Sequence, residues 1–385
     1  MLEDLYESAE RLMDKVRAYR RALHQIPEVG LDLPNTSAYV RDCLTELGLE
    51  PKPVGPCGWT VVLGQGEKTL LLRADMDALG VAERNELPFR STNGCMHACG
   101  HDMHTAILLG AAEVLKEHEA ELRCRVKLVF QPGEELGTGA QLLIEDGLLE
   151  APRVDAAAAL HVDALLPAGE CSYCTGVATS SIYDLFIHIR GKGGHSSKPE
   201  ETVSALAVGC AIYTELSGLV QREVSGFDTA ILAMCAMEAG SLPQPNIIPE
   251  TCEMSGTLRC FDGGVQDRLL RRIREIVEGV AQQYRATAEL DSLLTPFLTV
   301  DPDLAKTLDP ALRAAFGANK VTRTNKPLAG SEDFGYVSQH VPTFFFWVGA
   351  GGPDNAPLHN PNVLLDEAAL ISGLKAMVSL PFYWA

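Results

Sequence analysis

The sequence has no apolar run long enough to cross a bilayer, and its first ten residues lack the basic and apolar regions of a secretory leader. Positive charge is also scarce, since 32 Lys and Arg stand against 51 Asp and Glu, a net charge of −19. A surface this acidic repels nucleic acid and anionic membranes, so neither is expected as a partner. We therefore expect a cytoplasmic protein, while the net charge indicates nothing specific about its substrate.

Paired cysteine motifs are scarce as well. The 11 cysteines are odd in number and scattered through 385 residues, which in a cytoplasmic protein indicates reduced thiols. Cys171-Ser-Tyr-Cys174 is a single C-x-x-C, and two small core residues are its simplest interpretation. A thiol redox protein built on Cys95 and Cys99 has no support beyond the thiols themselves.

The chain is rich in buried-type strands that end in polar groups. Apolar runs occur at 60–63, 69–72, 126–130, 156–160 and 343–348, and helical patterns at 3–25, 37–47, 105–117 and 138–149. Near-continuous apolar strands that alternate with helices predict an α/β fold, a mostly parallel sheet with helices on both faces. Because ligands bind beyond the carboxyl ends of such strands, we expect the polar groups there to form one site.

Between about 177 and 291 the pattern changes. Residues 181–190 alternate apolar and polar, as a half-exposed antiparallel strand does, and two more strands are expected at 229–237 and 251–261. Helices are expected at 203–219 and 265–284. The chain is too long for one ordinary core, so two domains are expected. Because the segments on both sides of 177–291 belong to the parallel-sheet pattern, we predict an inserted α+β domain at 177–291, with a main domain formed by 1–176 and 292–385.

One segment concentrates the chemistry. Cys95-Met-His-Ala-Cys99-Gly-His101-Asp102-Met-His104 carries two thiols, three imidazoles and a carboxylate directly before a helical pattern, and these are ligands for a zinc-type ion. Glu134-Glu135 follows the strand at 126–130, where one carboxylate can bind metal while the other takes a proton from water. An isolated Glu-Glu pair is more often a solvated turn, but this position favours a site.

At these residues the chain resembles the aminoacylase, hippurate-hydrolase and indole-acetyl-amino-acid-hydrolase branch of the di-metal carboxypeptidase–amidohydrolase family. Ten motifs in the same order carry the resemblance over nearly the whole chain. They are His24-x-x-Pro27-Glu28, Arg73-Ala-Asp-Met-Asp-Ala-Leu79, Met96-His-Ala-Cys-Gly-His-Asp102, Gln131-Pro-x-Glu-Glu135, Leu160-His-Val162, Gly191-Lys-Gly-Gly-His195, Asn246-Ile-Ile-Pro249, Gly256-Thr-x-Arg259, Gly330-Ser-Glu-Asp-Phe334 and Pro357-Leu-His-x-Pro361. The resemblance implies a catalytic domain that holds two divalent ions and an inserted lid domain through which a homodimer forms.

The resemblance also implies the metal ligands and the general base. Carried over position by position, the ligands are Cys99, His101, Glu135, His161 and His359, and the base is Glu134. Five protein ligands for two ions about 3.5–4 Å apart require one shared atom. A neutral imidazole has one lone pair, whereas a thiolate can bridge. We therefore predict that Cys99 bridges one ion held by Glu135 and His359 and another held by His101 and His161. Zinc or manganese is expected, with nickel or cobalt as alternatives.

Further roles follow from the same resemblance. His195 of the lid is expected to polarise the scissile carbonyl, often in the site of the partner subunit, and Asn246 and Arg259 to hold the substrate carboxylate. Asp75, Asp77 and Asp102 are expected to orient ligand imidazoles, with turn or helix-cap roles as the alternative. His104 is expected to support the helix start, and His97 to lie outside the ligand set.

Four positions beside the metal segment depart from the family pattern. Gly80 stands in place of a proline, and Met103, Leu136 and Thr138 in place of glycines. These changes are expected to alter the pocket wall rather than the chemistry, and Met103 and Leu136 are predicted to line the acyl pocket.

The sequence therefore predicts a metal-dependent amidohydrolase that cleaves the amide bond of N-acyl amino acids. Metal would polarise the carbonyl and activate water, Glu134 would take and return the proton, and His195 would stabilise the oxyanion. A dipeptidase or carboxypeptidase with the same site is the close alternative. A catalytically silent metal-binding or small-molecule-binding protein is a third, against which the intact Glu134 and ligand set argue.

Overall fold

The chain divides into two structural units in the computed structural model, which describes residues 1–385. Unit 1 consists of Met1–Ala178, Leu298–Pro327 and Glu332–Ala385, and unit 2 of Thr179–Phe297 and Leu328–Ser331. Unit 2 is thus an insertion in unit 1. The boundary expected at 291 falls inside strand β13 (Thr287–Thr295), whose apolar pattern is interrupted by two acidic residues.

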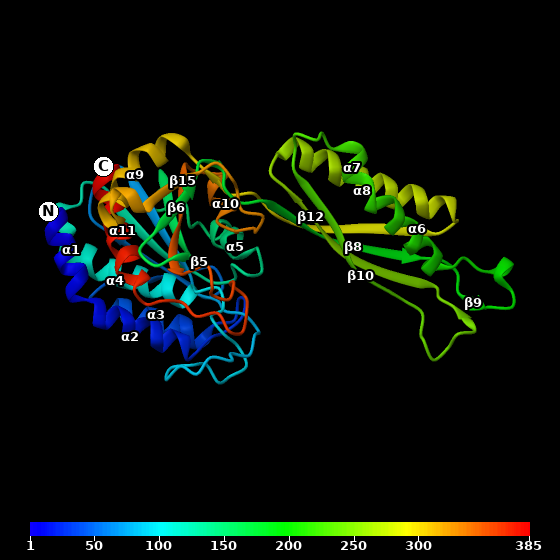
Figure 1. The fold of residues 1–385 in the computed structure, drawn as a ribbon, viewed down its shortest axis with the longest axis horizontal. Coiled ribbons are helices and arrows are strands. Elements are labelled where there is room, and N and C mark those ends of the chain that lie inside the picture. The colour runs from blue at the N-terminus through cyan, green and yellow to red at the C-terminus, as the bar shows by residue number, and fades with distance from the viewer. The chain divides into compact units, whose positions relative to one another are not determined.

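Unit 1 is built on an eight-stranded sheet (Figure 1). Its strands are β1 (Lys52–Val54), β2 (Gly58–Leu63), β3 (Thr69–Asp75), β4 (Arg125–Gln131), β5 (Ala156–Pro167), β6 (Cys171–Cys174), β15 (Val321–Thr324) and β16 (Thr343–Gly351). A separate two-stranded sheet pairs β7 (Gly176–Val177) with β14 (Thr299–Val300).

The helices of unit 1 flank this sheet (Figure 1). They are α1 (Leu2–Arg11), α2 (Met13–His24), α3 (Pro34–Glu46), α4 (His101–Glu117), α5 (Gly139–Glu145), α9 (Pro302–Phe316), α10 (Gly335–Ser338) and α11 (Ala369–Trp384), with short 3-10 turns at Glu119–Glu121 and Ala318–Lys320. The helix expected over 3–25 is two helices that meet at Leu12, whose N–H bonds to Ala9 O. Helix α5 is shorter than expected, because Gly147 turns the chain at φ +86.

The sheet order is β1-β2-β4-β3-β5-β16-β6-β15. The four central strands β4, β3, β5 and β16 run parallel to one another, and antiparallel pairings occur between β1 and β2, β2 and β4, and β16 and β6. Every residue of β3, and every residue of β4 after the first, is buried. The predicted α/β fold with a mostly parallel, helix-covered sheet is therefore confirmed.

Register places the polar groups of unit 1 at one edge of the central strands. Asp75, the last residue of β3, lies opposite Gln131, the last residue of β4. His161 differs from the expectation of a strand-end position, because β5 continues to Pro167. It lies beyond the last pairing of β5 with β3, at Ala159, and opposite Trp347 of β16. His161 is therefore level with Asp75 at the end of β3.

Unit 2 contains a four-stranded antiparallel sheet in the order β10-β12-β8-β13. Its strands are β8 (Ser181–Arg190), β10 (Ala230–Ala239), β12 (Thr251–Cys260) and β13, and β9 (Gly194–His195) pairs with β11 (Ile247–Ile248). Its helices are α6 (Ala205–Ser217), α7 (Leu219–Glu223) and α8 (Gly263–Gln283), with a 3-10 turn at Pro199–Glu201. Apolar residues of α6 and α8 form a core with one face of the sheet, as expected of an α+β unit.

No helix in the structure is both long enough and apolar enough to cross a membrane.

Candidate metal centre

The segment rich in thiols and imidazoles lies in unit 1, where α4 begins. Cys99 precedes the helix, and His101 is its first residue. Gly100 between them has φ +85, and a Cβ at this position would lie 2.3 Å from Val162 Cγ2 on β5. Only glycine fits both the conformation and the space. Its small size lets α4 start directly against β5, beside His161.

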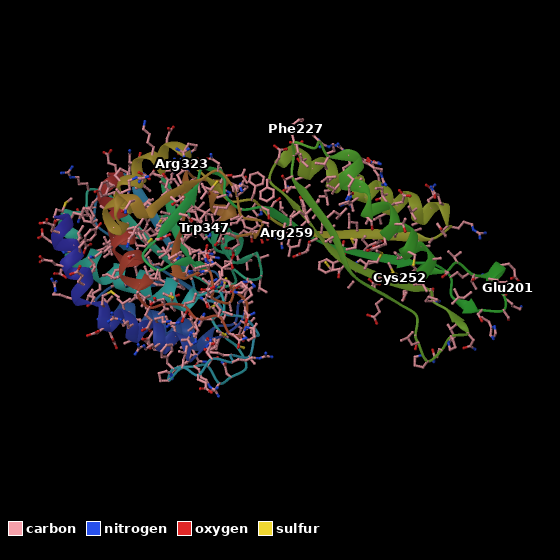
Figure 2. The ribbon with its side chains drawn as sticks, in the orientation of Figure 1. Glu201, Phe227, Cys252, Arg259, Arg323 and Trp347 are labelled. Atoms are coloured by element: carbon pink, nitrogen blue, oxygen red, sulfur yellow. The ribbon has the colours of Figure 1, made fainter.

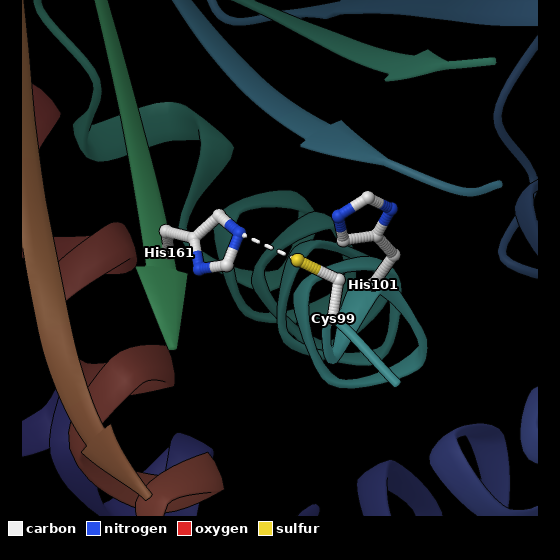
Figure 3. A group of neighbouring side chains, drawn as sticks. All are labelled: Cys99, His101 and His161. Atoms are coloured by element: carbon white, nitrogen blue, oxygen red, sulfur yellow. Dashed lines mark hydrogen bonds between the residues drawn. The ribbon is translucent and has the colours of Figure 1, made fainter. Parts of the chain in front are cut away.

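Cys99 Sγ lies between two sets of ligand atoms. It is 3.4 Å from His161 Nε2 and 3.2 Å from His359 Nε2, and Figure 3 shows the thiol facing His161 with His101 beside it. The ligand atoms of Cys99, His101 and His161 lie within 4.8 Å of one another, and so do those of Cys99, Glu135 and His359. The two sets share Cys99, and each corresponds to the set predicted for one ion.

The imidazoles of His101 and His161 each leave one nitrogen free for a metal. His101 Nδ1 donates to the carbonyl oxygen of Asp77 at 2.9 Å, and His161 Nδ1 donates to that of Val162 at 2.7 Å. A carbonyl oxygen only accepts, so each Nδ1 carries a proton, and in the neutral ring it is Nε2 that offers a lone pair to a metal.

His359 is held in a strained backbone conformation. Its φ is +68, which is uncommon for a residue with a side chain. The His359 N–H donates to Ala98 O at 2.9 Å, which fixes the loop after β16 beside Cys99. Strain of this kind persists where neighbouring contacts impose it, as they do at ligand sites.

The residues present fit a metal ion. The buried His101 Nε2 has no hydrogen-bond partner, and the buried Glu135 Oε1 has only an ion pair with His359 Nε2 at 3.4 Å. An unpaired buried polar atom costs about 1–3 kcal/mol, and ligation would satisfy both atoms. One thiol sulfur, three imidazole nitrogens and a carboxylate form a donor set that suits zinc and related divalent ions.

Asp77 positions both the loop that carries the two glutamates and one ligand imidazole. Its carboxylate accepts the backbone N–H groups of Glu134 and Glu135, each at 3.1 Å, and its carbonyl accepts the proton of His101. His101 Nδ1 thus faces both the carbonyl oxygen of Asp77 and its carboxylate, which lies 3.4 Å away, and the carboxylate also fixes the loop.

Asp75 acts on the site through His104 rather than on a ligand directly. Its carboxylate accepts from Arg73 Nη1 and from His104 Nδ1, both at 2.6 Å, and lies 3.7 Å from His101 Nε2. The Val162 N–H donates to His104 Nε2 at 2.9 Å, so both ring nitrogens of His104 are occupied. Burial lowers the pKa of His104 to about 3 and keeps it neutral. His104 therefore fixes the backbone beside His161.

Asp102 contacts no ligand imidazole. Its carboxylate accepts from Arg20 Nε at 3.0 Å and from His24 Nδ1 at 2.8 Å, which ties α2 to the start of α4. Burial opposes the charged form, yet the carboxylates of Asp102 and Glu83 raise the pKa of His24 to about 9. His97 is buried nearby, and neither ring nitrogen has a hydrogen-bond partner. The expected orienting role does not fit the contacts of Asp102.

The two large residues predicted to line the pocket wall have different surroundings. Met103 is fully buried among the core residues of unit 1, so its predicted place in the wall is wrong, because α4 turns this side chain inward. Leu136 is 47% exposed. Of the two, only Leu136 can contact a bound molecule.

Sequence reasoning missed a buried charge cluster behind Glu134. Arg73 Nη2 donates to Glu332 Oε1 and Asp333 Oδ1, each at 3.0 Å, and Gln131 Nε2 donates to Asp333 at 2.8 Å. Burial raises the pKa of Glu134, and the nearby Glu332 and Asp333 carboxylates raise it further. The adjacent acids in Gly330-Ser-Glu-Asp-Phe334 could have indicated this cluster, because that motif was part of the resemblance but had been given no role.

The three lid candidates occupy two ends of unit 2. His195 on β9 is exposed and lies opposite Ile247, and Asn246 O accepts the N–H of Ser196 at 3.0 Å. Arg259 lies near the other end of β12 and donates to Ala329 O at 3.1 Å. Figure 2 shows Arg259 and Cys252 apart along this strand, with Glu201 beyond Cys252. Extended chain from Thr251 to Arg259 spans roughly 25 Å, so one copy does not bring His195 and Arg259 together.

Known proteins similar to this chain share nearly its whole length. N-acetylcysteine deacetylase from Bacillus subtilis is 33% identical over 91% of this chain and 92% of its own. The IAA-amino acid hydrolase ILR1-like 4 of Arabidopsis thaliana is 34% identical over 94% of this chain and 83% of its own. A crystal structure from Bacillus subtilis, described as a dinuclear metal binding peptidase of the M20 family, superposes with a TM-score of 0.78 at 29% identity, over 96% and 98% of the two chains.

These relatives agree with the resemblance inferred from the motifs, and this chain also matches a family profile over most of its length. Residues 71–381 match the profile of peptidase family M20/M25/M40. The chain therefore belongs to this family of metal-dependent amidohydrolases and peptidases.

Proposed function

We propose that the protein hydrolyses the amide bond of N-acyl amino acids at a two-metal centre held by Cys99, His101, Glu135, His161 and His359. The observation that carries the proposal is the position of Cys99 Sγ, which belongs to both three-residue ligand sets. Glu134 lies next to ligand Glu135, with its Oε2 3.9 Å from His101 Nε2, and so is placed to act as general base. When bound, divalent ions polarise the scissile carbonyl and lower the pKa of a water molecule to about 7.

Side chains of the protein move the proton and hold the substrate. Glu134 takes a proton from the attacking water and returns it to the amide nitrogen as the C–N bond breaks. His195 donates a hydrogen bond to the developing oxyanion. Asn246 and the Arg259 guanidinium bind the carboxylate of the amino acid, the latter by two parallel hydrogen bonds.

The separation of His195 from Arg259 supports a homodimer formed through unit 2. An N-acyl amino acid is too short to contact both residues of one copy, so one of them must come from a second copy. Strand β10 is an open edge of the sheet and has no charged residue before Glu238. Uncharged edge strands of this length are templates for pairing with another chain. We propose that the partner copy supplies His195 and Asn246.

The donor atoms of the proposed ligands indicate the metal, and the free cysteines indicate the compartment. Zinc or manganese suits the mixed sulfur, nitrogen and oxygen donors, and nickel or cobalt would fit as well. All 11 cysteines are free in the structure, which favours a reducing compartment, and we propose the cytoplasm.

A panel of substrates tests the function and its close alternative. Apo-enzyme reloaded with zinc, manganese, nickel or cobalt is assayed on N-acetyl, N-benzoyl and N-indoleacetyl amino acids and on dipeptides. Because a similar structure is described as a peptidase, dipeptides are the decisive comparison. We expect chelator-sensitive cleavage of the N-acyl amino acids to exceed that of dipeptides. Faster cleavage of dipeptides would support the peptidase, and no cleavage with any metal would refute both.

A further inference from the structure

A short turn carries the proposed base, one proposed ligand and an exposed apolar side chain. The Gly137 N–H donates to Glu134 O at 2.7 Å and closes a turn over residues 134–137. The carboxylate of Asp77 fixes the first two residues of this turn. Leu136 follows ligand Glu135 directly, so its position relative to the reacting groups is as well defined as theirs.

The Leu136 side chain packs against a glycine and presents its remaining surface to solvent. Gly30 has φ +73, and a Cβ there would lie 3.1 Å from Leu136 Cδ1. Val29 is paired with Ala78, the residue after Asp77, and is 44% exposed. Leu136 is 47% exposed. Leu136 packs on Gly30, and Val29 is the residue before Gly30, so two exposed apolar side chains lie near the turn of Glu134 and Glu135; we call this pair the apolar wall.

We infer that this wall, Leu136 with Val29, contacts the acyl group of the substrate and selects uncharged acyl chains longer than acetyl. The inference rests on the proposed function and specifies its substrate class. Charge decides which end of the substrate faces the wall. The segment from 26 to 36 contains Glu28 and Asp32 but no Lys or Arg. These two acids repel the substrate carboxylate, so the acyl end lies at the wall.

The expected size of the effect follows from burial of apolar surface. Each methylene that moves from water to an apolar wall gains up to about a fourfold preference. Because about half of Leu136 is already covered, part of that gain is expected. We predict that kcat/KM for N-acyl-alanines rises at least about tenfold from acetyl through butyryl to hexanoyl.

Substitutions at the wall test the inference. Leu136→Asn keeps the size of the side chain but removes its apolar surface, and Val29→Thr keeps the shape of the neighbouring side chain while it replaces one methyl group with a hydroxyl. Both are expected to flatten the acyl-length series several-fold while the metal content stays at the wild-type value. Val62→Asn is the matched control, because Val62 is 42% exposed on β2. It should keep the wild-type slope. A Leu136→Lys variant is expected to gain cleavage of N-succinyl-alanine.

Binding separates failure of this inference from failure of the proposed reaction. The same N-acyl-alanines are titrated by calorimetry into the metal-loaded Glu134→Gln protein, which gives the slope whether or not amides are cleaved. The parent protein here is the Glu134→Gln variant, and it is compared with the same variant that also carries Leu136→Asn. An affinity that rises with acyl length in the parent protein, but not in the double variant, supports the wall even if no turnover occurs. An equal slope in both proteins, or no slope in the parent, overturns it.

Discussion

The proposed catalytic residues of unit 1 and those of unit 2 differ in how they are assembled. In unit 1, ligand candidates from four segments, ending with His359 near the carboxyl terminus, meet in two sets that share Cys99, and the ligand atoms of each set lie within 4.8 Å of one another. In unit 2, His195 on the β9–β11 pair and Arg259 on β12 of the four-stranded sheet lie at two ends of the unit. Parallel strands deliver their carboxyl ends to one edge, whereas antiparallel strands deliver alternate ends to opposite edges. The parallel sheet therefore brings the residues of the proposed metal centre together within one chain, whereas the separation of His195 from Arg259 in unit 2 fits the proposed dimer.

The largest effect is expected in unit 1, at the base. Glu134→Gln should lower kcat by about 10³-fold or more, because the proton of the attacking water then has no acceptor. Metal content, measured by mass spectrometry, should stay at the wild-type value. Glu145→Gln, on exposed α5, is the control and should be fully active. Activity within a few-fold of wild type in Glu134→Gln would remove Glu134 from the mechanism.

His195 tests whether unit 2 serves a second copy. His195→Gln should lower kcat by about 10²–10³-fold, since a donor to the oxyanion is lost. Mixing it with Glu134→Gln distinguishes the two arrangements. If His195 acts in the partner's site, each mixed dimer contains one intact site, and an equal mixture recovers about a quarter of wild-type activity. No recovery, after mass spectrometry has shown that subunits exchange, would place His195 in the site of its own chain.

Substitutions at Asp77 and Asp102 distinguish support of the proposed metal centre from support of the fold. Asp77→Ala should weaken metal binding about 10–100-fold, because the loop of Glu134 and Glu135 loses its anchor. Asp102→Ala should lower the melting temperature and leave metal affinity close to that of wild type. Competition with a chromophoric chelator measures both affinities. Equal loss in the two variants would show that Asp102 also orients a ligand.

The smallest effect concerns pH and stability in unit 1. The pKa of His24 is about 9 in the fold and about 6.5 when unfolded, so its stabilising charge is complete below pH 6.5 and is lost as pH rises through 9. The stability advantage of wild type over His24→Gln should therefore fall by up to about 3 kcal/mol between pH 6 and 10. Urea unfolding followed by Trp fluorescence reports unit 1, because Trp59, Trp347 and Trp384 all lie there. A difference that does not change with pH would contradict the raised pKa.

The sequence was sufficient for the α/β fold and for the residues that meet around Cys99. Near-continuous apolar strands have few alternatives to a covered parallel sheet, and thiol and imidazole ligands in ordered motifs are distinctive. The limits were set by contacts between distant segments. In the sequence, Met103 and Leu136 are both large apolar residues beside the metal motifs. In the structure, helix α4 buries Met103, whereas the turn after Glu135 leaves Leu136 exposed. Asp102 sits beside a ligand in sequence, yet its partners Arg20 and His24 come from α2.

The sequence also did not predict the edge strand β13 or the charge pairs between distant segments. Strand β13 carries Glu289 and Asp291 on its exposed face, and because both residue types are uncommon in strands, the segment is a weak strand signal. The role of Glu332 and Asp333 depends on their hydrogen bonds with Arg73, which lies more than 250 residues earlier in the chain. Local patterns cannot show such pairings.

The central claim is that Cys99 joins two metal sets in one centre, and a crystal structure of the metal-loaded protein with anomalous data tests it most directly. We predict two ions, with the Cys99 sulfur about 2.3 Å from each if they are zinc, Glu135 and His359 on one ion, and His101 and His161 on the other. A sulfur that contacts only one ion, or a single ion held by all five residues, would contradict this account.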